Sequence, residues 1–434
     1  MPKRLDAEDP GFDGEFTAFL GEKRETTADV NSAVTRILLD VQERGDDAVC
    51  DATALFDRFP ITPETMAFSS SEISAARAGC SSDTLDALEL AAERIRCFHE
   101  KQLPEGFDET DAAGLRLGYR WTAVTAAGLY VPGGTAAYPS SVLMNAIPAK
   151  VAGVERLVMV VPTPDGVVNP LVLAAAEVAK VDTIFRIGGA QAIGALAYGT
   201  KTINPVDKIV GPGNAFVAEA KRQVYGTVGI DMIAGPSEIL VLADTQNDPS
   251  WIAADLLSQA EHDPAAQAIL ITDDAEFAEL VVAAIETHLT TLSRSETARA
   301  SWQQFGAVIM VPSLIDAIPL IDRIAPEHLE IATDDARAIA FKVRNAGAIF
   351  IGRFVPEALG DYLAGPNHVL PTARSARFSS GLGVSDFMKR TSMIECDSRG
   401  LRAVGPAAIT LARAEGLDAH ALSISIRLNE PHSS

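Results

Sequence analysis

The chain has 434 residues, of which 47% are hydrophobic and 22% are charged, and these totals indicate a globular protein with at least two domains. The 36 Lys and Arg residues are outnumbered by 58 Asp and Glu residues, which gives a formal net charge of −22. A surface this acidic repels phosphate groups, so we expect neither nucleic acid nor an anionic membrane as a partner.

The sequence shows no membrane-spanning stretch, signal peptide or paired cysteines, and these features bear on where we expect the protein to be. No stretch is apolar over the roughly 18 residues that a membrane-spanning helix requires. Residues 1–16 lack the apolar core of a signal peptide, so we expect a cytoplasmic protein. The four cysteines show no paired spacing, which predicts free thiols and not a disulfide framework or a cysteine zinc site.

The first part of the chain is read as helical. Residues 1–25 are interpreted as a polar arm with a short helical piece. Apolar residues recur at helical spacing over Asp29–Glu43, where Gly45 ends the element, and again over Ser71–Gln102.

From about residue 126 onward, apolar runs alternate with helical patterns. Alternation of this kind is typical of parallel sheets covered by helices on both faces, and it predicts an α/β fold. The predicted strands are Leu157–Val161, Thr183–Ile187, Lys208–Val210, Ile239–Ala243, Ala268–Thr272, Ala307–Val311, His328–Ala332 and Ala348–Gly352.

The number of strands predicts two α/β domains, because one sheet could hardly hold them all. We expect residues 26–129 and 238–383 to form a discontinuous first domain, and residues 130–237 to form a second. The tail, residues 384–434, contains a helical stretch ended by Gly416. It is too short to build a core of its own, so we expect it to pack on a partner subunit.

A metal site is suggested at the end of a predicted helix. Asp248 and Pro249 provide the cap and first turn of that helix, and Gln259 and His262 lie near its end. Residues three apart share a helix face with Cβ atoms about 5–6 Å apart, which suits two ligands of one ion. A polar helix end facing water is the alternative.

A glycine- and proline-rich loop, GDYLAGPNHVLPT, carries Asp361 and His368. A carboxylate, an imidazole and an amide oxygen together suit Zn²⁺ or Mn²⁺. Asp361 could instead simply cap a turn.

Glu327 and His328 lie side by side at the start of a predicted strand. A histidine can act as a general base near neutral pH, and a nearby glutamate can hold or relay the proton. The alternative is an exposed polar strand start.

Three glycine turns, VPGGTAAYPSS, RIGGAQAIGALAYG and IVGPGNAFVAEAKR, each follow a predicted strand, and the last two lead into helices. Helix N-termini favour anions such as pyrophosphate. None of the three spells the G-x-G-x-x-G fingerprint, and tight turns in any α/β sheet would look similar.

Taken together, these segments resemble the histidinol dehydrogenase family. The similarity covers nearly the whole chain. It is carried by GLYVPGG, GGAQAI, KIVGPGNAFVAEAKRQV, IDMIAGPSEILVLAD, LLSQAEHD, APEHLEI, PEALGDYLAGPNHVLPT and EGLDAHA.

The resemblance implies a homodimer of two incomplete Rossmann-like domains per subunit. It implies oxidation of L-histidinol to L-histidine through L-histidinal, with NAD and one Zn²⁺ per site. It also assigns residues by their match to the family motifs. The zinc ligands would be Gln259, His262, Asp361 and His420, the last from the partner subunit, and the catalytic pair would be Glu327 and His328. The substrate contacts would be the four zinc ligands and His328, together with Ser237, His368 and Glu415. The NAD contacts would be Tyr130, Gln191 and Asn214.

Three other functions remain open at this point. A zinc hydrolase would use the same metal ligands, with Glu327 activating water. A related zinc- and NAD-dependent dehydrogenase could act on another small alcohol. A non-catalytic regulator that binds NAD or a metal is the third.

Overall fold

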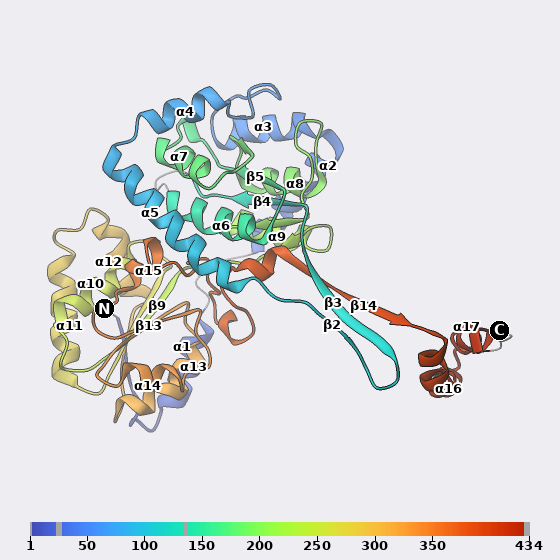
Figure 1. Cartoon of the computed structure of the whole chain (residues 1–434). Coiled ribbons are helices and arrows are strands. Elements are labelled where there is room, and N and C mark those ends of the chain that lie inside the picture. Colours follow the sequence, from blue (N-terminus) through green and yellow to red (C-terminus); the bar gives the residue numbers. More distant parts are fainter. Residues whose placement is uncertain (1, 23–27, 134–137, 429–434) are drawn as a thin grey trace.

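The computed structural model describes residues 2–22, 28–133 and 138–428, and two parallel sheets form its body (Figure 1). The six-stranded sheet has the order β1-β11-β10-β9-β12-β13, and the five-stranded sheet has the order β6-β5-β4-β7-β8. The strands of the first are β1 Lys3–Asp6, β9 Glu238–Ala243, β10 Gln267–Thr272, β11 Ala307–Met310, β12 His328–Ala332 and β13 Ala348–Ile351; those of the second are β4 Ala126–Tyr130, β5 Arg156–Val160, β6 Thr183–Phe185, β7 Lys208–Val210 and β8 Gly229–Ile230.

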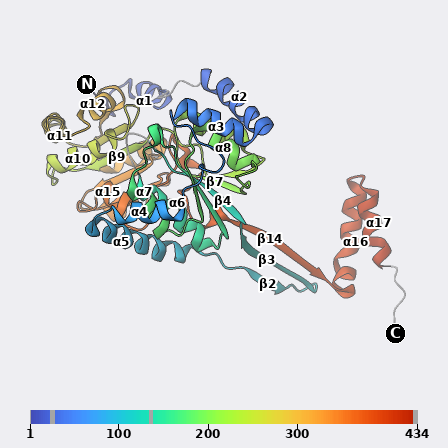
Figure 2. The same cartoon turned by 90° about the horizontal axis from the view of Figure 1, so that it is seen from above.

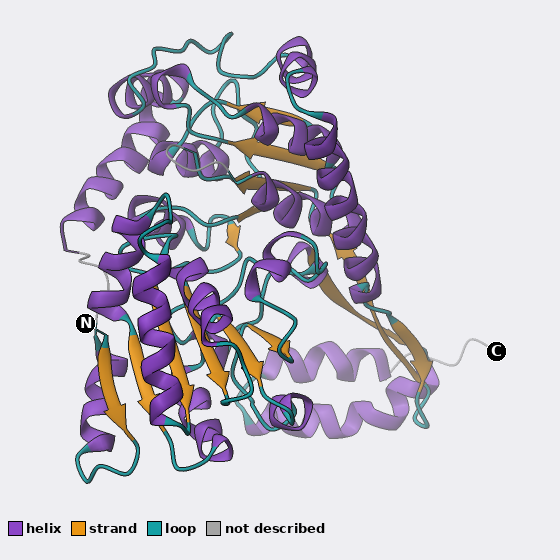
Figure 3. Ribbon diagram, turned by 90° about the vertical axis from the view of Figure 1, so that its left-hand side faces the viewer, coloured by secondary structure: helices purple, strands orange, loops and turns teal. Residues whose placement is uncertain are grey.

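Helices pack around both sheets (Figure 3). With the five-stranded sheet lie α2 Ala28–Arg44, α3 Asp46–Phe56, α4 Ser70–Ala78, α5 Ser82–His99, α6 Pro139–Ala152, α7 Pro170–Val178, α8 Gly189–Tyr198 and α9 Ala215–Val224. With the six-stranded sheet lie α1 Phe12–Gly21, α10 Pro249–Ala260, α11 Ala275–His288, α12 Ser295–Phe305, α13 Ile318–Ile324, α14 Ala336–Ala340 and α15 Glu357–Tyr362. None of the described helices is both long and apolar enough to cross a membrane.

The two sheets share one topology. Counted along the chain from β4 and from β9, each has its strands in the order 3-2-1-4-5, with β1 added at the edge of the six-stranded sheet. This is the Rossmann order without its sixth strand. The expected α/β class with two incomplete Rossmann-like units is therefore confirmed, and every strand predicted from the apolar runs is present.

The central strand β9 illustrates why these runs form buried parallel strands. All six of its residues are buried. Ile239 and Val241 pack into the core on one face of the sheet, while Leu240 and Leu242 pack into the core on the other. Full burial of such a side chain contributes roughly 1.5–3 kcal/mol, so this strand, which is covered on both faces, is apolar at every position from Ile239 to Ala243.

The N-terminal part of the chain is divided between the two units differently from our expectation. Residues 26–129 were expected to join residues 238–383, but α2 packs on α8 and α9, and α4 and α5 pack on α6 and α7. The helices of residues 28–99 therefore belong to the five-stranded unit together with β4. Periodicity shows which face of a helix is apolar, but it does not show which sheet that face covers.

Residues 1–25 also differ from the expected polar arm. β1 pairs in parallel with β11, with Lys3 opposite Ala307, and Phe12, Phe16 and Phe19 of α1 are buried in the core of the six-stranded unit. The start of the chain is thus part of that unit, although residues 23–25 lie outside the described ranges.

A third, antiparallel sheet extends away from the body as an arm. It consists of β2 Phe107–Thr110, β3 Leu115–Ala123 and β14 Met388–Cys396 in the order β14-β3-β2, and it ends in α16 Ser398–Ala414 and α17 Asp418–Leu428 (Figures 1 and 2). The sequence did not predict these strands, because β14 is exposed along almost its whole length and has no buried alternation to reveal it. The predicted tail helix is present as α16.

A buried ion pair fixes the turn that follows β7. The Lys221 ammonium donates to a carboxylate oxygen of Asp231 and to the Gly211 carbonyl at 3.0 Å, while the Gly211 N–H donates to Asp231 at 2.8 Å. The two charged side chains are only 2% and 1% exposed. Gly211 has φ +107°, and a Cβ there would lie 2.1 Å from the Tyr130 carbonyl oxygen. The pair thus holds this turn against the end of β4.

We expect Lys221→Met to lower the free energy of unfolding by about 3–5 kcal/mol, because Asp231 would remain buried without its counter-charge. Urea titration of the purified protein measures this change. The control is Arg44→Met, which breaks an ion pair with 44% and 71% exposed side chains and should cost less than about 1 kcal/mol. Equal losses in the two variants would show that the buried pair adds no stability.

Candidate active site

One cavity of about 960 Å³ lies where the two units meet. On one side it is lined by residues that follow β4, β7 and β8, at the carboxyl edge of the five-stranded sheet, where ligands bind in such folds. On the other side it is lined by residues that begin or precede β9 and β12, at the amino edge of the six-stranded sheet. The expected site residues that line it are Tyr130, Gln191, Asn214, Ser237, Gln259, His262, Glu327, His328, Asp361 and His368.

Two expected site residues do not reach this cavity within one chain. Glu415 is the residue that ends α16, and His420 is in the first turn of α17. Both are exposed on the arm, which points away from the body (Figure 2). Their assignment as substrate and metal contacts therefore stays a prediction that depends on a second subunit.

His328, the first residue of β12, is buried and has its tautomer fixed. Its Nδ1 lies 2.9 Å from the Glu238 carbonyl oxygen, which can only accept, so Nδ1 carries the proton. Nε2 then keeps its lone pair, and it has no hydrogen-bond partner among the described residues. Burial lowers the pKa of His328, which keeps the imidazole neutral. This is the state that a general base requires.

Glu327, beside it, is also buried, and it is held by the same neighbouring strand. Its Oε2 accepts the Glu238 N–H at 2.8 Å and lies 3.7 Å from Nδ1 of His328. Burial raises the pKa of Glu327 well above its ordinary value, and the carboxylates of Glu238 and Asp361 raise it further. A raised pKa makes the carboxylate form of Glu327 a stronger base than an ordinary glutamate.

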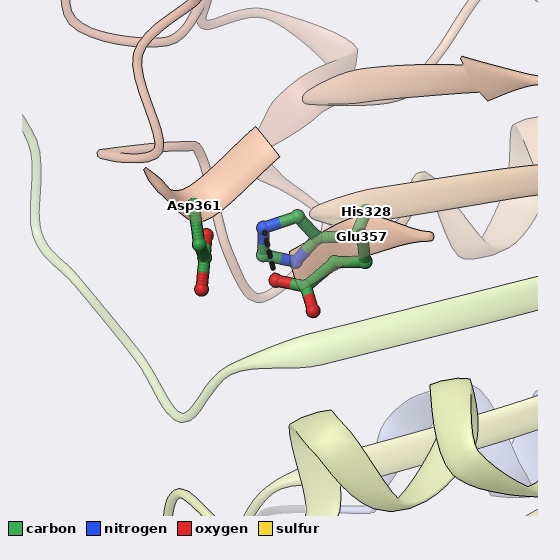
Figure 4. Close-up of side chains that lie close together, drawn as sticks. All are labelled: His328, Glu357 and Asp361. Carbon is green, nitrogen blue, oxygen red and sulfur yellow. Dashed lines mark ion pairs between the residues drawn. The ribbon is translucent and has the colours of Figure 1, made fainter. Parts of the chain in front are cut away.

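Glu357 is a site residue that the sequence reasoning missed. It begins α15, is buried, and places Oε1 3.5 Å from Nε2 of His328 (Figure 4). Asp361 lies four residues later and therefore on the same face of α15. One ligand atom from each of His328, Glu357 and Asp361 lies within 4.8 Å of the others. The spacing of the two acids in PEALGDY was the available signal.

Glu357 and Asp361 share one proton. Burial raises the pKa of Glu357 to about 9, and the adjacent Asp361 contributes to this rise. Burial alone would raise the pKa of Asp361 as well, but a hydrogen bond from His368 and the nearby imidazoles lower it to about 2. The proton thus resides on Glu357, and Asp361 carries the negative charge of the pair.

Three residues on the cavity wall fit a divalent cation. Gln259, in the last turn of α10, is 1% exposed, and its Oε1 has no partner among the described residues. His262 lies just beyond the helix, and burial lowers its pKa, so it is neutral as a ligand must be. With anionic Asp361 these groups supply an amide oxygen, an imidazole and a carboxylate, which suits zinc. His328, Glu357 and Asp361 form a second group of possible ligands, which shares Asp361 with the first.

The opposite wall holds the three residues expected to contact NAD. The Tyr130 hydroxyl accepts the Gly189 N–H at 3.1 Å, and burial raises the pKa of Tyr130 to about 12, so the phenol stays neutral. Asn214 caps α9 by accepting the N–H groups of Phe216 and Val217. Gln191 is 1% exposed, and its Oε1 lacks a partner in the described part of the chain. Of the turn VPGGTAAYPSS, residues 134–137 lie outside the described ranges.

Fold and cavity together define an α/β enzyme with a nucleotide-binding edge and a metal-ligand set, as expected of an oxidoreductase. The histidinol dehydrogenase family model matches residues 20–428. Histidinol dehydrogenase of Rhodospirillum rubrum is 64% identical over 430 residues, and that of Ruegeria pomeroyi is 62% identical over 429, with 99% of both chains covered in each case. The crystal structure of histidinol dehydrogenase from Elizabethkingia anophelis matches with a TM-score of 0.93 and 35% identity over 98% of each chain. The chain belongs to the histidinol dehydrogenase family and is an oxidoreductase.

We expect Glu357→Gln to flatten the dependence of stability on pH. Glu357 is protonated in the folded protein up to a pKa of about 9, but only up to its ordinary value of 4.5 when unfolded. Its contribution to stability is therefore complete below pH 4.5 and is lost as the pH rises toward 9. The wild type should lose up to about 1.4 kcal/mol per pH unit in this window through this group, and the variant should not.

Thermal unfolding at pH 5 to 9 measures this difference. The protein is first treated with a chelator, because a cation beside Asp361 would add its own charge. Glu276→Gln, at an exposed glutamate, is the control and should follow the wild type. Parallel pH profiles for wild type and Glu357→Gln would show that Glu357 is not protonated in the folded state.

Proposed function

We propose that this protein oxidises L-histidinol to L-histidine through L-histidinal, the last two steps of histidine biosynthesis. It would use NAD and one Zn²⁺ per site, and it would act as a cytoplasmic homodimer with shared active sites. The observation that carries the proposal is His328: its Nδ1 is tied to Glu238, and its Nε2 belongs to a cavity lined by both a metal-ligand set and the expected coenzyme contacts. Family membership supports the choice of substrate.

In the first oxidation, His328 accepts the hydroxyl proton of histidinol on Nε2 while the carbon-bound hydride leaves as the C=O bond forms. The Nδ1–H bond to Glu238 keeps the ring oriented, and the resulting imidazolium is stabilised by anionic Asp361. NAD supplies the hydride acceptor for each oxidation. Its contacts would be Tyr130, Gln191 and Asn214.

The second oxidation requires water to add to the aldehyde. Glu327 would accept a proton from that water as its oxygen bonds to the carbonyl carbon, since burial raises its pKa and so makes its carboxylate a stronger base. Once the proton of the first oxidation has passed from His328 to solvent, the hydrate loses its hydride as the acid forms, and His328 again takes the hydroxyl proton. A cysteine thiohemiacetal is not required: Cys50, Cys80, Cys97 and Cys396 are free thiols, and none of them lines the cavity.

The metal would be held by Gln259, His262, Asp361 and His420 of the partner subunit. Zinc in this position supplies a binding centre for the imidazole and amine of the substrate and so fixes the alcohol beside the base. Ser237 and His368 of the same chain, with Glu415 of the partner subunit, would complete the substrate pocket. His368 is already oriented, because its Nδ1 bonds to the Asp361 carbonyl and its Nε2 to Ser141.

The wild-type protein should form two NADH per L-histidinol consumed and should lose this activity to a chelator. His328→Gln should reduce kcat by about 10²–10⁴-fold with the zinc content unchanged, because it removes the base without removing a ligand. His288→Gln is the control: that histidine bonds to Ser250 outside the cavity. Metal-dependent hydrolysis without NADH formation would establish a zinc hydrolase, and normal turnover by His328→Gln would overturn the assignment of the base.

Shared active sites can be tested by complementation. His328→Gln and His420→Asn should each be inactive alone, but a dimer containing one chain of each kind has one intact site. Co-expressed with two different tags and purified through both, this heterodimer should show about half of the wild-type activity per dimer. The matched control pairs His328→Gln with His262→Asn, which places one defect in each site. Activity no higher in the first heterodimer than in the control would exclude a ligand from the partner.

A further inference from the structure

The cavity continues past the expected NAD contacts toward the end of β5, the second strand of the five-stranded unit. In the Rossmann topology, an acidic residue near the end of the second strand binds the 2′-hydroxyl of the adenosine ribose in NAD-dependent proteins. Here the residues that follow β5 are Val161, Pro162, Thr163 and Pro164, and the first acid is Asp165. Asp165 has a 59% exposed side chain and does not line the cavity.

Asp57 brings a carboxylate to this strand end from a different part of the chain. It directly follows α3, is only 8% exposed, and lines the cavity. One carboxylate oxygen accepts the Thr163 N–H at 3.2 Å, and the Asp57 carbonyl accepts the Asp165 N–H at 2.7 Å. These two bonds fix the end of α3 to the loop after β5. A carboxylate has several lone pairs, so Asp57 retains acceptor capacity beyond the Thr163 bond.

The cation nearest in sequence is already engaged. Arg58 binds Asp165 in a bidentate pair, with distances of 2.8 Å from Nε and 2.5 Å from an Nη atom, and it does not line the cavity. Among the described residues that do, Arg294 is the only Lys or Arg, and it bonds to the His262 carbonyl on the metal side. The strand-end region therefore offers a buried carboxylate and no lining cation for a phosphate.

The surfaces around Asp57 suit a flat aromatic base. Phe56, next to Asp57, and Pro162 and Pro164, on either side of Thr163, line the cavity, and Phe56 is 52% exposed. Apolar faces with one carboxylate between them match the two halves of an adenosine, a base that stacks and a ribose whose hydroxyls donate.

We propose that Asp57 determines the coenzyme specificity of this protein by accepting the 2′-hydroxyl of the adenosine ribose of NAD and repelling the 2′-phosphate of NADP. The inference rests on the proposed function, which brings a nicotinamide coenzyme into this cavity. In complete Rossmann domains an acidic residue near the end of the second strand binds the ribose 2′-hydroxyl. The inference assigns this role to Asp57, which follows α3. Discrimination then comes from a repulsive element as well as an attractive one.

The test measures dissociation constants by titration calorimetry on the zinc-loaded protein. The wild type should bind NAD more tightly than NADP. Asp57→Asn should raise the dissociation constant of NAD about tenfold, because a charge-assisted hydrogen bond is lost. The preference for NAD over NADP, measured as the ratio of their dissociation constants, should fall by at least the same factor. Asp57→Glu keeps the negative charge, so this variant should still bind NADP more weakly than NAD. If Asp57 acted only by maintaining local structure, this variant would lose the preference as well.

The matched control is Asp46→Asn. Asp46 is buried at the opposite end of α3, accepts the Thr202 hydroxyl at 2.9 Å, and does not line the cavity. This variant should leave the ratio unchanged. Because substitutions at Asp57 could prevent folding, the wild type is also titrated with the 2′-deoxyadenosine analogue of NAD, which should bind about tenfold more weakly than NAD.

The outcomes separate the two proposals. A wild-type protein that binds no dinucleotide overturns the proposed function and this inference with it. Binding of NAD together with equal affinity for NADP, an unchanged ratio in Asp57→Asn, or undiminished binding of the 2′-deoxy analogue overturns the inference alone.

Discussion

The chemistry of the site depends on one hydrogen bond between neighbouring strands, from Nδ1 of His328 to the Glu238 carbonyl. β9 and β12 pair with His328 opposite Ile239, so the carbonyl that accepts the hydrogen bond belongs to the residue just before this pairing begins. A shift of one residue would turn the imidazole to the other face of the sheet. The register is fixed by the apolar residues of both strands, which are buried on both faces. The core thus determines which nitrogen of His328 is free to act.

Around that imidazole the protein buries more acid than base. Burial raises the pKa of Glu327, of Glu330 and of Glu357, and it raises the pKa of Asp255 to about 6. Isolated buried carboxylates are costly, and protonation is the cheapest remedy. Asp361 is the exception: a hydrogen bond from the His368 side chain lowers its pKa to about 2, so it stays ionised. A cation in this cavity would therefore meet one negative charge and neutral donors, in keeping with an ion that positions a substrate.

Much of this arrangement could be predicted from the sequence, and the remainder has physical causes. Buried parallel strands are apolar along their whole length, so runs such as Ile239–Ala243 were predictable, and long specific motifs identified the candidate residues. The sequence of a helix shows that one face is apolar, but it does not show which sheet this face covers. For this reason residues 26–129 were assigned to the wrong unit. Glu357 was missed because its role depends on the fold, which brings α15 against β12. β14 was not predicted because it is exposed along almost its whole length and lacks the alternation of apolar and polar residues that indicates a half-buried strand.

The missing dinucleotide fingerprint also has a structural explanation. Glycine-rich turns bind pyrophosphate because the first N–H groups of the following helix are free to donate. Here the Tyr130 hydroxyl already accepts the N–H that begins α8, and the Asn214 side chain already accepts two N–H groups at the start of α9. Glycine at Gly211 and at Gly189 serves close approach and backbone conformation instead. Three of the N–H groups in the first turns of α8 and α9 are thus already bonded to side chains, which leaves fewer of them to bind a phosphate than a glycine fingerprint would offer.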